Sequence, residues 1–361
     1  MLHYLLKIFN KFFRGVNTLK KVFATQEMVK KNILRNIRTT LLRLGSATKV
    51  ELSQAIEISF PTISKFLAEM EKDGEIILVG LDESSGGRRA KRYRYNPEHM
   101  LGLAIFLEKS ESNYTIFNCI GEVKEQGKVS SVLINDGLPV LTSCIENLLN
   151  KFPKISSLAI GVPGSVDNGR IIFIPEYDQF QNFDLKGYYE EYFSIPVAVE
   201  NDMNASVLGY NNKTGNINGQ SLIYLYLGQN GPGAGIMING DVVRGSTSFS
   251  GEVSFVPQYN NRNFGQALEI KNGSKKIILY ENDETIDAIS RLVASFAAII
   301  NPHSIIFSNS EIKKEMLNKM AICSSKYIPS EHLPELVTSD MKQDYLFGLQ
   351  SIGLDLMIND Q

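Results

Sequence analysis

Apolar residues in the first third of the chain repeat at helical spacing. Between residues 28 and 44 they recur every three or four positions and form one face, at Ile33, Ile37, Leu41 and Leu44. The repeat stops at Gly45, which predicts the end of a first helix. The next segment, "TKVE", is a capping box, because Thr48 can accept from the backbone of Glu51 while the Glu51 carboxylate reaches back to Thr48. A second, short helix is therefore expected to run to about Ile56.

A third helix is predicted where Pro61 follows Ser59 and Phe60. Proline leaves no N–H unsatisfied in the first turn, so Ser59 or Phe60 can cap a helix that Pro61 opens and Gly74 ends. Its buried stripe is expected at Ile63, Phe66, Leu67 and Met70. The outward positions are mostly small and polar, which suits the major groove of DNA: Thr62, Ser64, Lys65, Ala68 and Glu69. Of this face and the cap, the candidate DNA contacts are Ser59, Thr62, Ser64 and Lys65.

A basic hairpin is predicted after the third helix. An apolar strand, "EIILVGL", leads into a Ser- and Gly-rich tip and then into a strand in which Arg92 and Arg94 alternate with tyrosines. Arg88 and Arg89 at the tip are placed to enter a minor groove or to grip phosphates. Three helices followed by a basic wing predict a winged helix-turn-helix DNA-binding domain over residues 26–97. The alternative is a three-helix module that docks on another protein.

From about residue 98 the pattern changes to strands that alternate with helices. Strand-like runs include "LGLAIFL", "NYTIFNCI", "SLAIGVPGSV" and "PVAVEND", and two further strands flank the Gly-rich turn in "SLIYLYLGQNGPGAGIMING". Helices are expected near 138–152, from Ala205 onward, and near 285–300. This alternation predicts an α/β body over residues 98–361.

Length and charge support a division between a front piece and a body. A chain of 361 residues exceeds the roughly 250–300 at which a single core stops growing, which predicts two or more domains. Residues 1–97 hold 18 Lys and Arg against 9 Asp and Glu, whereas the remainder holds 19 against 30. A basic front piece favours double-stranded DNA as its partner, because clustered cations gain affinity by displacing counterions from phosphates.

The apolar runs are short and the cysteines few. The run near 292–300 falls far below the ~20 residues needed to cross a bilayer, so no membrane partner is expected. Three widely spaced cysteines form neither a disulfide framework nor a metal pair, which favours a cytoplasmic location: Cys119, Cys144 and Cys323. Residues 1–25 are basic and amphipathic, and their apolar positions are interrupted too often for a secretory signal. They are predicted to form a helix that packs on its own protein or on a dimer partner.

Four short motifs in the body share a characteristic order and spacing. They read "GVPGSVD" at 161–167, "VENDMNAS" at 199–206, "LGQNGPGAGIMINGDVVRG" at 227–245 and "GEVSF" at 251–255. Together they resemble the motif series of the ROK family, named after repressors, open reading frames and kinases. The repressors of that family also begin with a winged helix whose wing is similar to "SSGGRR", so the resemblance spans the whole chain. It implies a winged helix-turn-helix followed by a two-lobed body of the actin-like ATPase fold, similar to sugar kinases.

The resemblance implies a sugar pocket built from these motifs. In kinases of the family, the aspartate that matches Asp202 takes a proton from the attacking sugar hydroxyl, a role open to any carboxylate within hydrogen-bond reach. Asn201 matches a sugar-binding amide and Glu252 a second sugar ligand. Gly164, in the first motif, and Glu176, which replaces the asparagine of the family's P-N-L motif, complete the candidate ligand-binding set. With three carboxylates pointing inwards the pocket would be acidic, which makes an amino sugar a candidate ligand.

The chain departs from the kinases of this family at its nucleotide contacts. The D-x-G-G-T-type turn that binds phosphate is replaced by Leu107, Glu108 and Lys109. The T-G-x-G-type run reads "GQNGPGAG", and Ser308 and Asn309 replace a Gly-Gly pair beside the adenosine. Because phosphoryl transfer depends on holding and neutralising phosphates, no catalytic residue is expected. Asp202 is then predicted to hold a ligand hydroxyl or to remain as a relic.

The zinc ligands of the family are replaced as well. Phe255 stands in place of the histidine in the family's G-E-x-x-H motif, and "QYNNRNFGQALE" contains none of the family's cysteines. A tetrahedral zinc site is built from thiolate and imidazole ligands, so no metal and no other cofactor are expected.

These observations lead to one hypothesis and two alternatives. The chain is predicted to be a sequence-specific DNA-binding transcriptional regulator, a repressor of carbohydrate genes that acts as a homodimer or higher homo-oligomer and responds to a small carbohydrate effector. The first alternative is a ROK sugar kinase with residual ATP-dependent activity. The second is a DNA-binding protein that responds to no ligand, which the replacements at Glu176 and Phe255 keep open.

Overall fold

A computed structural model describes most of the chain. The described residues are 26–81, 89–108, 111–130, 137–174, 180–215, 219–228, 231–259, 261–268 and 283–359. The helix predicted over 1–25, the wing residue Arg88 and the pocket residue Glu176 lie outside these ranges. Within them, no helix is both long and apolar enough to cross a membrane.

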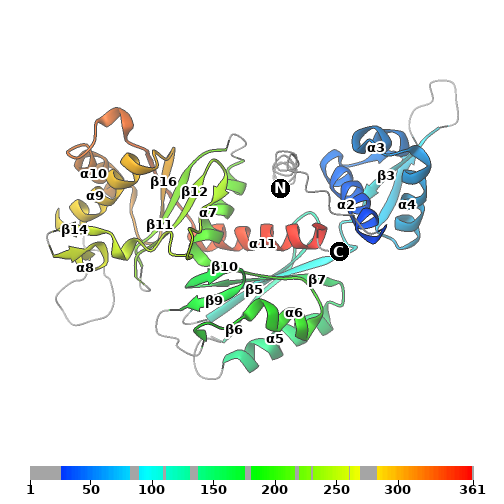
Figure 1. Cartoon of the computed structure of the whole chain (residues 1–361), viewed down its shortest axis with the longest axis horizontal. Coiled ribbons are helices and arrows are strands. Elements are labelled where there is room, and N and C mark those ends of the chain that lie inside the picture. The colour runs from blue at the N-terminus through cyan, green and yellow to red at the C-terminus, as the bar shows by residue number, and fades with distance from the viewer. Residues whose placement is uncertain are drawn as a thin grey trace.

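The N-terminal part consists of three helices and a small antiparallel sheet, called the head below (Figure 1). Its elements are α2 (Gln26–Leu44), β1 (Ala47–Thr48), α3 (Lys49–Ile56), α4 (Phe60–Lys72), β2 (Ile76–Leu81) and β3 (Lys91–Tyr95), with the strands in the order β1-β3-β2. The predicted capping box is confirmed: the Glu51 N–H donates to Thr48 Oγ1 at 3.3 Å, and the Thr48 N–H donates to Glu51 Oε2 at 2.7 Å.

The helix α4 has the predicted start and the predicted buried stripe. Its buried residues are Ile63, Phe66, Leu67 and Met70, and Pro61 lies in its first turn. Ser59 occupies the N-cap position, but its hydroxyl pairs with the Thr62 hydroxyl at 2.8 Å and makes no capping bond to the backbone. The strand β3 contributes Tyr93 and Tyr95 to the core beneath α4. The remaining face of α4 is therefore left polar and accessible.

The body is divided into two lobes, each with its own five-stranded sheet. The first lobe has the strand order β10-β7-β4-β5-β6, in which β10, β7 and β4 are parallel and β5 and β6 antiparallel. Its elements are β4 (Leu101–Leu107), β5 (Glu111–Asn118), β6 (Val123–Ser130), α5 (Gly137–Lys151), β7 (Ile155–Val162), β8 (Ser165–Asp167), β9 (Arg170–Phe173), α6 (Leu185–Phe193) and β10 (Val197–Asn201). Apolar residues of the sheet, α5 and α6 form one core.

The second lobe has the strand order β13-β12-β11-β16-β17, with β11, β16 and β17 parallel. Its elements are β11 (Leu222–Tyr226), β12 (Gly233–Ile238), β13 (Asp241–Val242), the short 3-10 helix η2 (Val253–Phe255), β14 (Pro257–Tyr259), β15 (Arg262–Asn263), α8 (Phe264–Leu268), α9 (Asp283–Ile299), β16 (Ser304–Ser308), α10 (Lys314–Ser324), η3 (Ser330–His332) and β17 (Glu335–Ser339). The α/β class predicted for the body is confirmed.

Two helices lie between the lobes, α7 (Asp202–Lys213) and α11 (Met341–Asn359). Their backbones pass so close that a Cβ on Gly209 would lie 1.7 Å from the Asp344 carbonyl oxygen, and one on Gly348 would lie 1.9 Å from that of Ala205. Figure 1 shows α11, in red, running from between the lobes towards the head. The predicted start of the helix at Ala205 is wrong: α7 begins three residues earlier, at Asp202, because Asn201 caps it.

Candidate ligand-binding site

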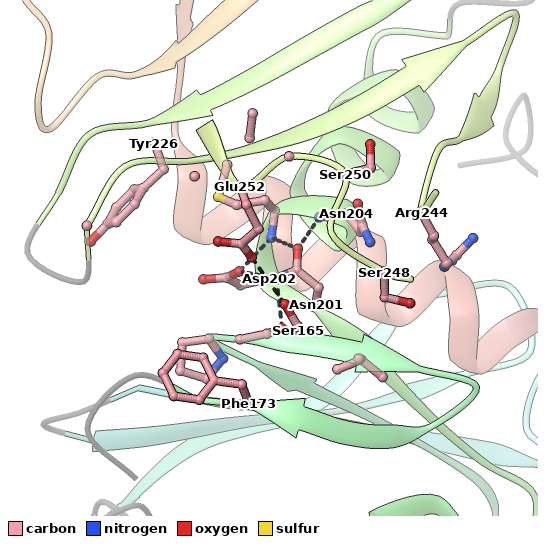
Figure 2. A pocket seen from close by; sticks show the side chains of 18 of the residues that line it. Ser165, Phe173, Asn201, Asp202, Asn204, Tyr226, Arg244, Ser248, Ser250 and Glu252 are labelled. Carbon is pink, nitrogen blue, oxygen red and sulfur yellow. Dashed lines mark hydrogen bonds between the residues drawn. The ribbon is translucent and has the colours of Figure 1, made fainter. Parts of the chain in front are cut away.

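A pocket lies between the two lobes where β7 and β10 end (Figure 2). The pocket is partly open to solvent and is lined by both polar and apolar side chains. The first lobe lines it with the turn 163–166 and Phe173, and α7 adds its first turn. The second lobe contributes Tyr226, the turn 231–234 and the loop 244–252. The chain thus places residues from all four of its family-like motifs around one cavity.

The Asn201 side chain links the first turn of α7 to the turn at Gly164. Its side-chain oxygen accepts from the backbone N–H groups of Met203 and Asn204 at 2.9 and 3.0 Å, which caps α7. Its amide nitrogen donates to the Gly164 carbonyl at 2.9 Å and to Asp202 Oδ1 at 3.0 Å. Both donors and both acceptor positions of the amide are therefore used. A direct ligand contact by Asn201, as the family resemblance implies, requires one of these bonds to open.

Gly164 has a steric role at the same point. A Cβ there would lie 2.2 Å from the carbonyl oxygen of Phe173, in the hairpin of β8 and β9. Only glycine allows this approach, and it presents the Gly164 carbonyl to Asn201.

Asp202 lies in the first turn of α7, partly buried, with its carboxylate in the pocket. Oδ1 accepts from the Met203 N–H at 2.8 Å as well as from Asn201. Burial raises the pKa of Asp202 to about 7, although the Met203 N–H opposes the rise, and the negative charge of Glu252 adds to it. At neutral pH this carboxyl therefore exchanges readily between accepting and donating a hydrogen bond.

Glu252 faces Asp202 from the second lobe (Figure 2). Its Oε1 accepts from the Ser165 hydroxyl at 3.1 Å, and this bond crosses the cleft between the lobes. Of the predicted ligand-binding set, the structure brings together Gly164, Asn201, Asp202 and Glu252, while Glu176 lies outside the described residues. Two facing carboxylates can accept hydrogen bonds from the hydroxyl groups of a polyol.

Arg244 is a pocket residue that the sequence did not reveal. Its guanidinium forms a close ion pair with Glu200, a second link between the lobes, and Glu200 is only 7% exposed. Glu200 Oε1 also accepts from Asn204 Nδ2 at 3.1 Å and from the Asn201 N–H at 3.0 Å. Arg244 offsets the charge of Glu200, which is not one of the three carboxylates predicted for the pocket. Arg244 lies near the end of the quoted motif at 227–245, but the motif does not show that it pairs with Glu200.

A partly buried carboxylate lies beside the Gly-rich turn of the second lobe. Glu311 Oε2 accepts from the Leu227 N–H at 2.9 Å, and its Oε1 would lie 2.3 Å from a Cβ on Gly228. Burial raises the pKa of Glu311 to about 7, with the Leu227 hydrogen bond opposing the rise. The first N–H of this turn is therefore satisfied by a carboxylate of the chain itself. Over the described ranges, no three His, Cys, Asp or Glu side chains are grouped as metal ligands.

The predicted DNA contacts that fall within the described residues are accessible. Ser59, Lys65 and Arg89 are exposed, and Thr62 and Ser64 are partly exposed on the first turns of α4. Arg92 has a structural role, because it donates to Glu51 Oε1 at 2.9 Å and to the Ser46 carbonyl at 3.1 Å.

The raised pKa of Asp202 predicts a pH-dependent cost to stability. Folding raises this pKa from its ordinary 3.8 to about 7. The contribution of the Asp202 carboxyl to the free energy of unfolding is therefore fully present below pH 4 and is lost as the pH rises through 7. We expect Asp202→Asn to match the wild type near pH 4 and to exceed its free energy of unfolding by about 2 kcal/mol at pH 8, allowing for partial exposure. Urea unfolding across this range measures the difference, with the exposed Asp167→Asn as control. A difference in unfolding free energy between the two proteins that does not change with pH would contradict the raised pKa of Asp202.

Comparison with known proteins agrees with the geometry. The sequence profile of the ROK family matches residues 109–265. The xylose repressor of Caldicellulosiruptor bescii is 29% identical over 225 residues, which cover 59% of this chain and 55% of that protein. The chain therefore spans little more than half the length of that relative. The xylose repressor of Bacillus subtilis strain 168 is 24% identical over 378 residues, covering 92% of this chain and 97% of the relative.

Solved structures show the same fold. A ROK family transcriptional regulator, described as a homologue of the Escherichia coli MLC protein, has a TM-score of 0.67 at 20% identity, covering 92% of this chain and all of that one. A ROK family glucokinase from Streptomyces griseus, solved with glucose and AMPPNP, has a TM-score of 0.54 at 18% identity and covers 70% of this chain and 99% of that one. The body thus has the two-lobed α/β fold that sugar kinases share with a regulator. Residues 109–265 of this chain form a ROK family domain.

Proposed function

We propose that this protein is a sugar-responsive, sequence-specific DNA-binding repressor that acts in the cytoplasm as a homodimer or higher homo-oligomer. The observation that carries the proposal is the combination, in one chain, of an accessible polar face on α4 with a two-lobed body that encloses a carboxylate-lined pocket. The alignment with the xylose repressor of B. subtilis supports it, because that alignment covers 92% of this chain and so extends over head and body together.

In this proposal residues 26–97 form a winged helix-turn-helix and residues 98–361 the ligand-sensing body. The order of helices and strands in the head supports the first assignment, since β2 and β3 form the hairpin of a wing. Each head places the start of α4 in a major groove, with Thr62, Ser64 and Lys65 towards the bases and Ser59 beside them. Arg88 and Arg89 hold phosphates or enter the minor groove. Two copies then read half-sites about one helical turn apart.

The effector in this proposal is a neutral or amino sugar. Asp202 and Glu252 accept hydrogen bonds from its hydroxyls, or bind an ammonium group, while Asn201, Gly164 and the residue Glu176 shape the pocket. The names of the relatives, xylose repressor and N-acetylglucosamine repressor, make D-xylose and N-acetyl-D-glucosamine the first sugars to test. Effector binding changes DNA affinity by the difference between its affinities for the two states of the protein.

The test begins with the selection of genomic DNA fragments by the purified protein. The site bound most tightly is then measured by fluorescence anisotropy with and without a panel of sugars that includes these two. We expect a near-palindromic site whose affinity changes at least about tenfold with one sugar, a coupling of typical size. The same shift should vanish in Asp202→Asn. Equal binding under every condition would support the alternative of a ligand-independent DNA-binding protein.

The head assignment makes a prediction about salt. We expect Arg89→Ala to weaken binding to the selected site and to random DNA alike, and to reduce the slope of log K against log salt by about 1, because one phosphate contact is lost. Thr62→Ala should instead lower the preference for the selected site by roughly 1–3 kcal/mol and leave the salt slope unchanged. Lys326→Ala, on the far lobe, is the control. An unaltered slope in Arg89→Ala would count against the wing assignment.

One observation favours a second candidate function, a residual sugar kinase. A carboxyl whose pKa is about 7, such as that of Asp202, is suited to act as a general base. The carboxylate of Glu311 beside the Gly-rich turn opposes this function, because it would repel a nucleotide phosphate. Sugar-dependent release of ADP that Asp202→Asn abolishes would establish the kinase; no release at millimolar ATP and sugar would remove it.

A further inference from the structure

The hydroxyl of Tyr345, on α11, is buried without a hydrogen-bond partner among the described residues. The side chain is 3% exposed, and its ring packs on Phe106 with the centroids 5.1 Å apart. The hydroxyl lies where a Cβ on Gly161 would be, 2.1 Å away, so the glycine is needed to admit it. Leaving a buried polar group unpaired is costly, and such a group calls for an explanation.

The hydroxyl lies close to the strand that leads to Asp202. Gly161, which it contacts, is the register partner of Glu200 in the pairing of β7 with β10, and Glu200 is two residues before Asp202. Burial raises the pKa of Tyr345, and the negative charges of Asp202, Glu108 and Glu200 raise it further. Glu200 is paired with Arg244 and Glu108 with Lys342, while Asp202 Oδ1 accepts from Asn201 and Met203. The phenol is therefore a donor without a partner in the part of the body where β7 and β10 lead to Asp202.

The helix that carries Tyr345 is tied to both lobes. Asp344, fully buried, accepts from the Tyr224 hydroxyl at 3.0 Å in the second lobe and from Lys213 Nζ at 3.1 Å at the end of α7. Further along, the Gly353 carbonyl accepts from the Ser157 hydroxyl at 2.9 Å in the first lobe. Together with the close backbone crossing at Gly348, these bonds make α7 and α11 one rigid unit that begins at Asp202.

The far end of α11 reaches the head. Met357 Sδ lies 3.5 Å from the thiol of Cys119, and both belong to the single apolar core that also contains Tyr95 and the buried faces of α2 and α4. The short link from β3 to β4 is fixed at both sides, since the Asn96 N–H donates to the Glu75 carbonyl at 2.9 Å and the Cys119 N–H to the Pro97 carbonyl at 3.1 Å. Figure 1 shows α11 running from between the two lobes towards this junction. The head therefore cannot turn without disturbing the end of α11.

We infer that Tyr345 is a positioning residue that couples the occupancy of Asp202 to the orientation of the head through α11. The inference rests on the proposed function, which supplies the ligand and the DNA. A ligand hydroxyl that donates to Asp202 competes with Asn201 for the carboxylate and lets it turn towards the phenol. The Tyr345 hydroxyl then gains an acceptor, and the shift of α11 is passed to the junction at Met357. The Tyr345 hydroxyl thus lacks an acceptor in one state and has one in the other. A switch requires such a difference in bonding between its two states.

Hydrogen–deuterium exchange on the full chain, without DNA or sugar, tests this coupling. Asp202→Asn changes the charge beside the phenol and offers it an amide partner. We expect it to alter exchange by at least about threefold in peptides from α11 and α2, as well as around residues 199–206. In the double variant with Tyr345→Phe, the change at 199–206 should remain while that in α2 disappears. Tyr192→Phe, an exposed tyrosine of α6, is the matched control and should leave the α2 change intact.

Two outcomes would overturn the inference: α2 exchange that Asp202→Asn does not alter, or an α2 change that survives Tyr345→Phe. Tyr345→Phe should also keep or raise the melting temperature, because it removes a buried hydroxyl that lacks a partner. A fall of several degrees would show that the hydroxyl is bonded in this state and would equally overturn the inference. The exchange experiment contains neither DNA nor sugar. If the protein failed to bind DNA or sugar, the proposed function would be refuted, but the exchange result would still show whether Asp202 and the head are coupled.

Discussion

Alanine at Gly209 will leave little folded protein. The new Cβ would lie 1.7 Å from the carbonyl oxygen of Asp344, a backbone atom that cannot move without separating α7 from α11. Separating these helices also disturbs the buried contacts of Asp344 with Tyr224 and Lys213. We expect a loss of at least about 3 kcal/mol in the free energy of unfolding, at the upper end of what overpacking costs, and the same for Gly348→Ala. Thermal and urea unfolding of the purified variants measure the loss.

Gly265→Ala is the matched control for this prediction. Gly265 lies in the helix α8, and the nearest atom to a Cβ there is Cβ of Ser254 at 3.4 Å, which is an ordinary contact. Alanine should therefore be neutral or stabilising at this position, because it favours the helix and restricts the unfolded chain. If Gly209→Ala unfolds no more easily than Gly265→Ala, the close crossing of α7 and α11 is not present in solution.

Removing Arg38 is expected to have the second large effect. Its guanidinium forms a close ion pair with Glu75 inside the head, where the two residues are 8% and 5% exposed. The Tyr95 hydroxyl adds a second hydrogen bond to the same Glu75 oxygen at 3.2 Å. Arg38→Met leaves Glu75 as a buried charge without its cation, so we expect a loss of about 3–5 kcal/mol in stability. In the proposed function, operator affinity should fall with it, because Glu75 lies three residues after the end of α4.

The double variant Arg38→Met with Glu75→Gln separates charge from packing. It removes both charges and keeps an amide that can accept from Tyr95, so most of the stability should return. Circular dichroism melts of the wild type, the single variant and the double variant provide the comparison. A double variant as unstable as Arg38→Met would mean that the arginine stem, and not the charge pair, stabilises the head.

Local signals in the sequence were sufficient for the head. The capping box at Thr48 and the buried stripe of α4 act over one or two turns, so the residues that determine them are adjacent in the chain. The helix α11 gave no comparable signal, because it is buried between two lobes and has apolar residues on more than one face. Its position depends on contacts with α7, β4 and β7, which lie more than a hundred residues away in the sequence.

The site was predictable only in part for the same reason. The resemblance of "VENDMNAS" and "GEVSF" to family motifs identified Asp202 and Glu252, and the structure places both in one pocket. It could not show that the Asn201 amide is fully engaged, since three of its four partners lie on its own helix and one on a distant turn. Nor could it reveal Arg244, whose link to Glu200 exists only once the lobes face each other.

The place of α11 in the chain also bears on how the protein matures. Among the described elements α11 is the last to leave the ribosome, yet its residues Leu349, Leu354, Met357 and Ile358 belong to the core that the head shares with the body. Early domains can fold while synthesis continues, but here the shared interior stays incomplete until α11 has been synthesised. The nascent chain therefore exposes apolar surface for longer than one built from independent domains, which makes the body a candidate client for chaperones and a premature stop before α11 a route to degradation.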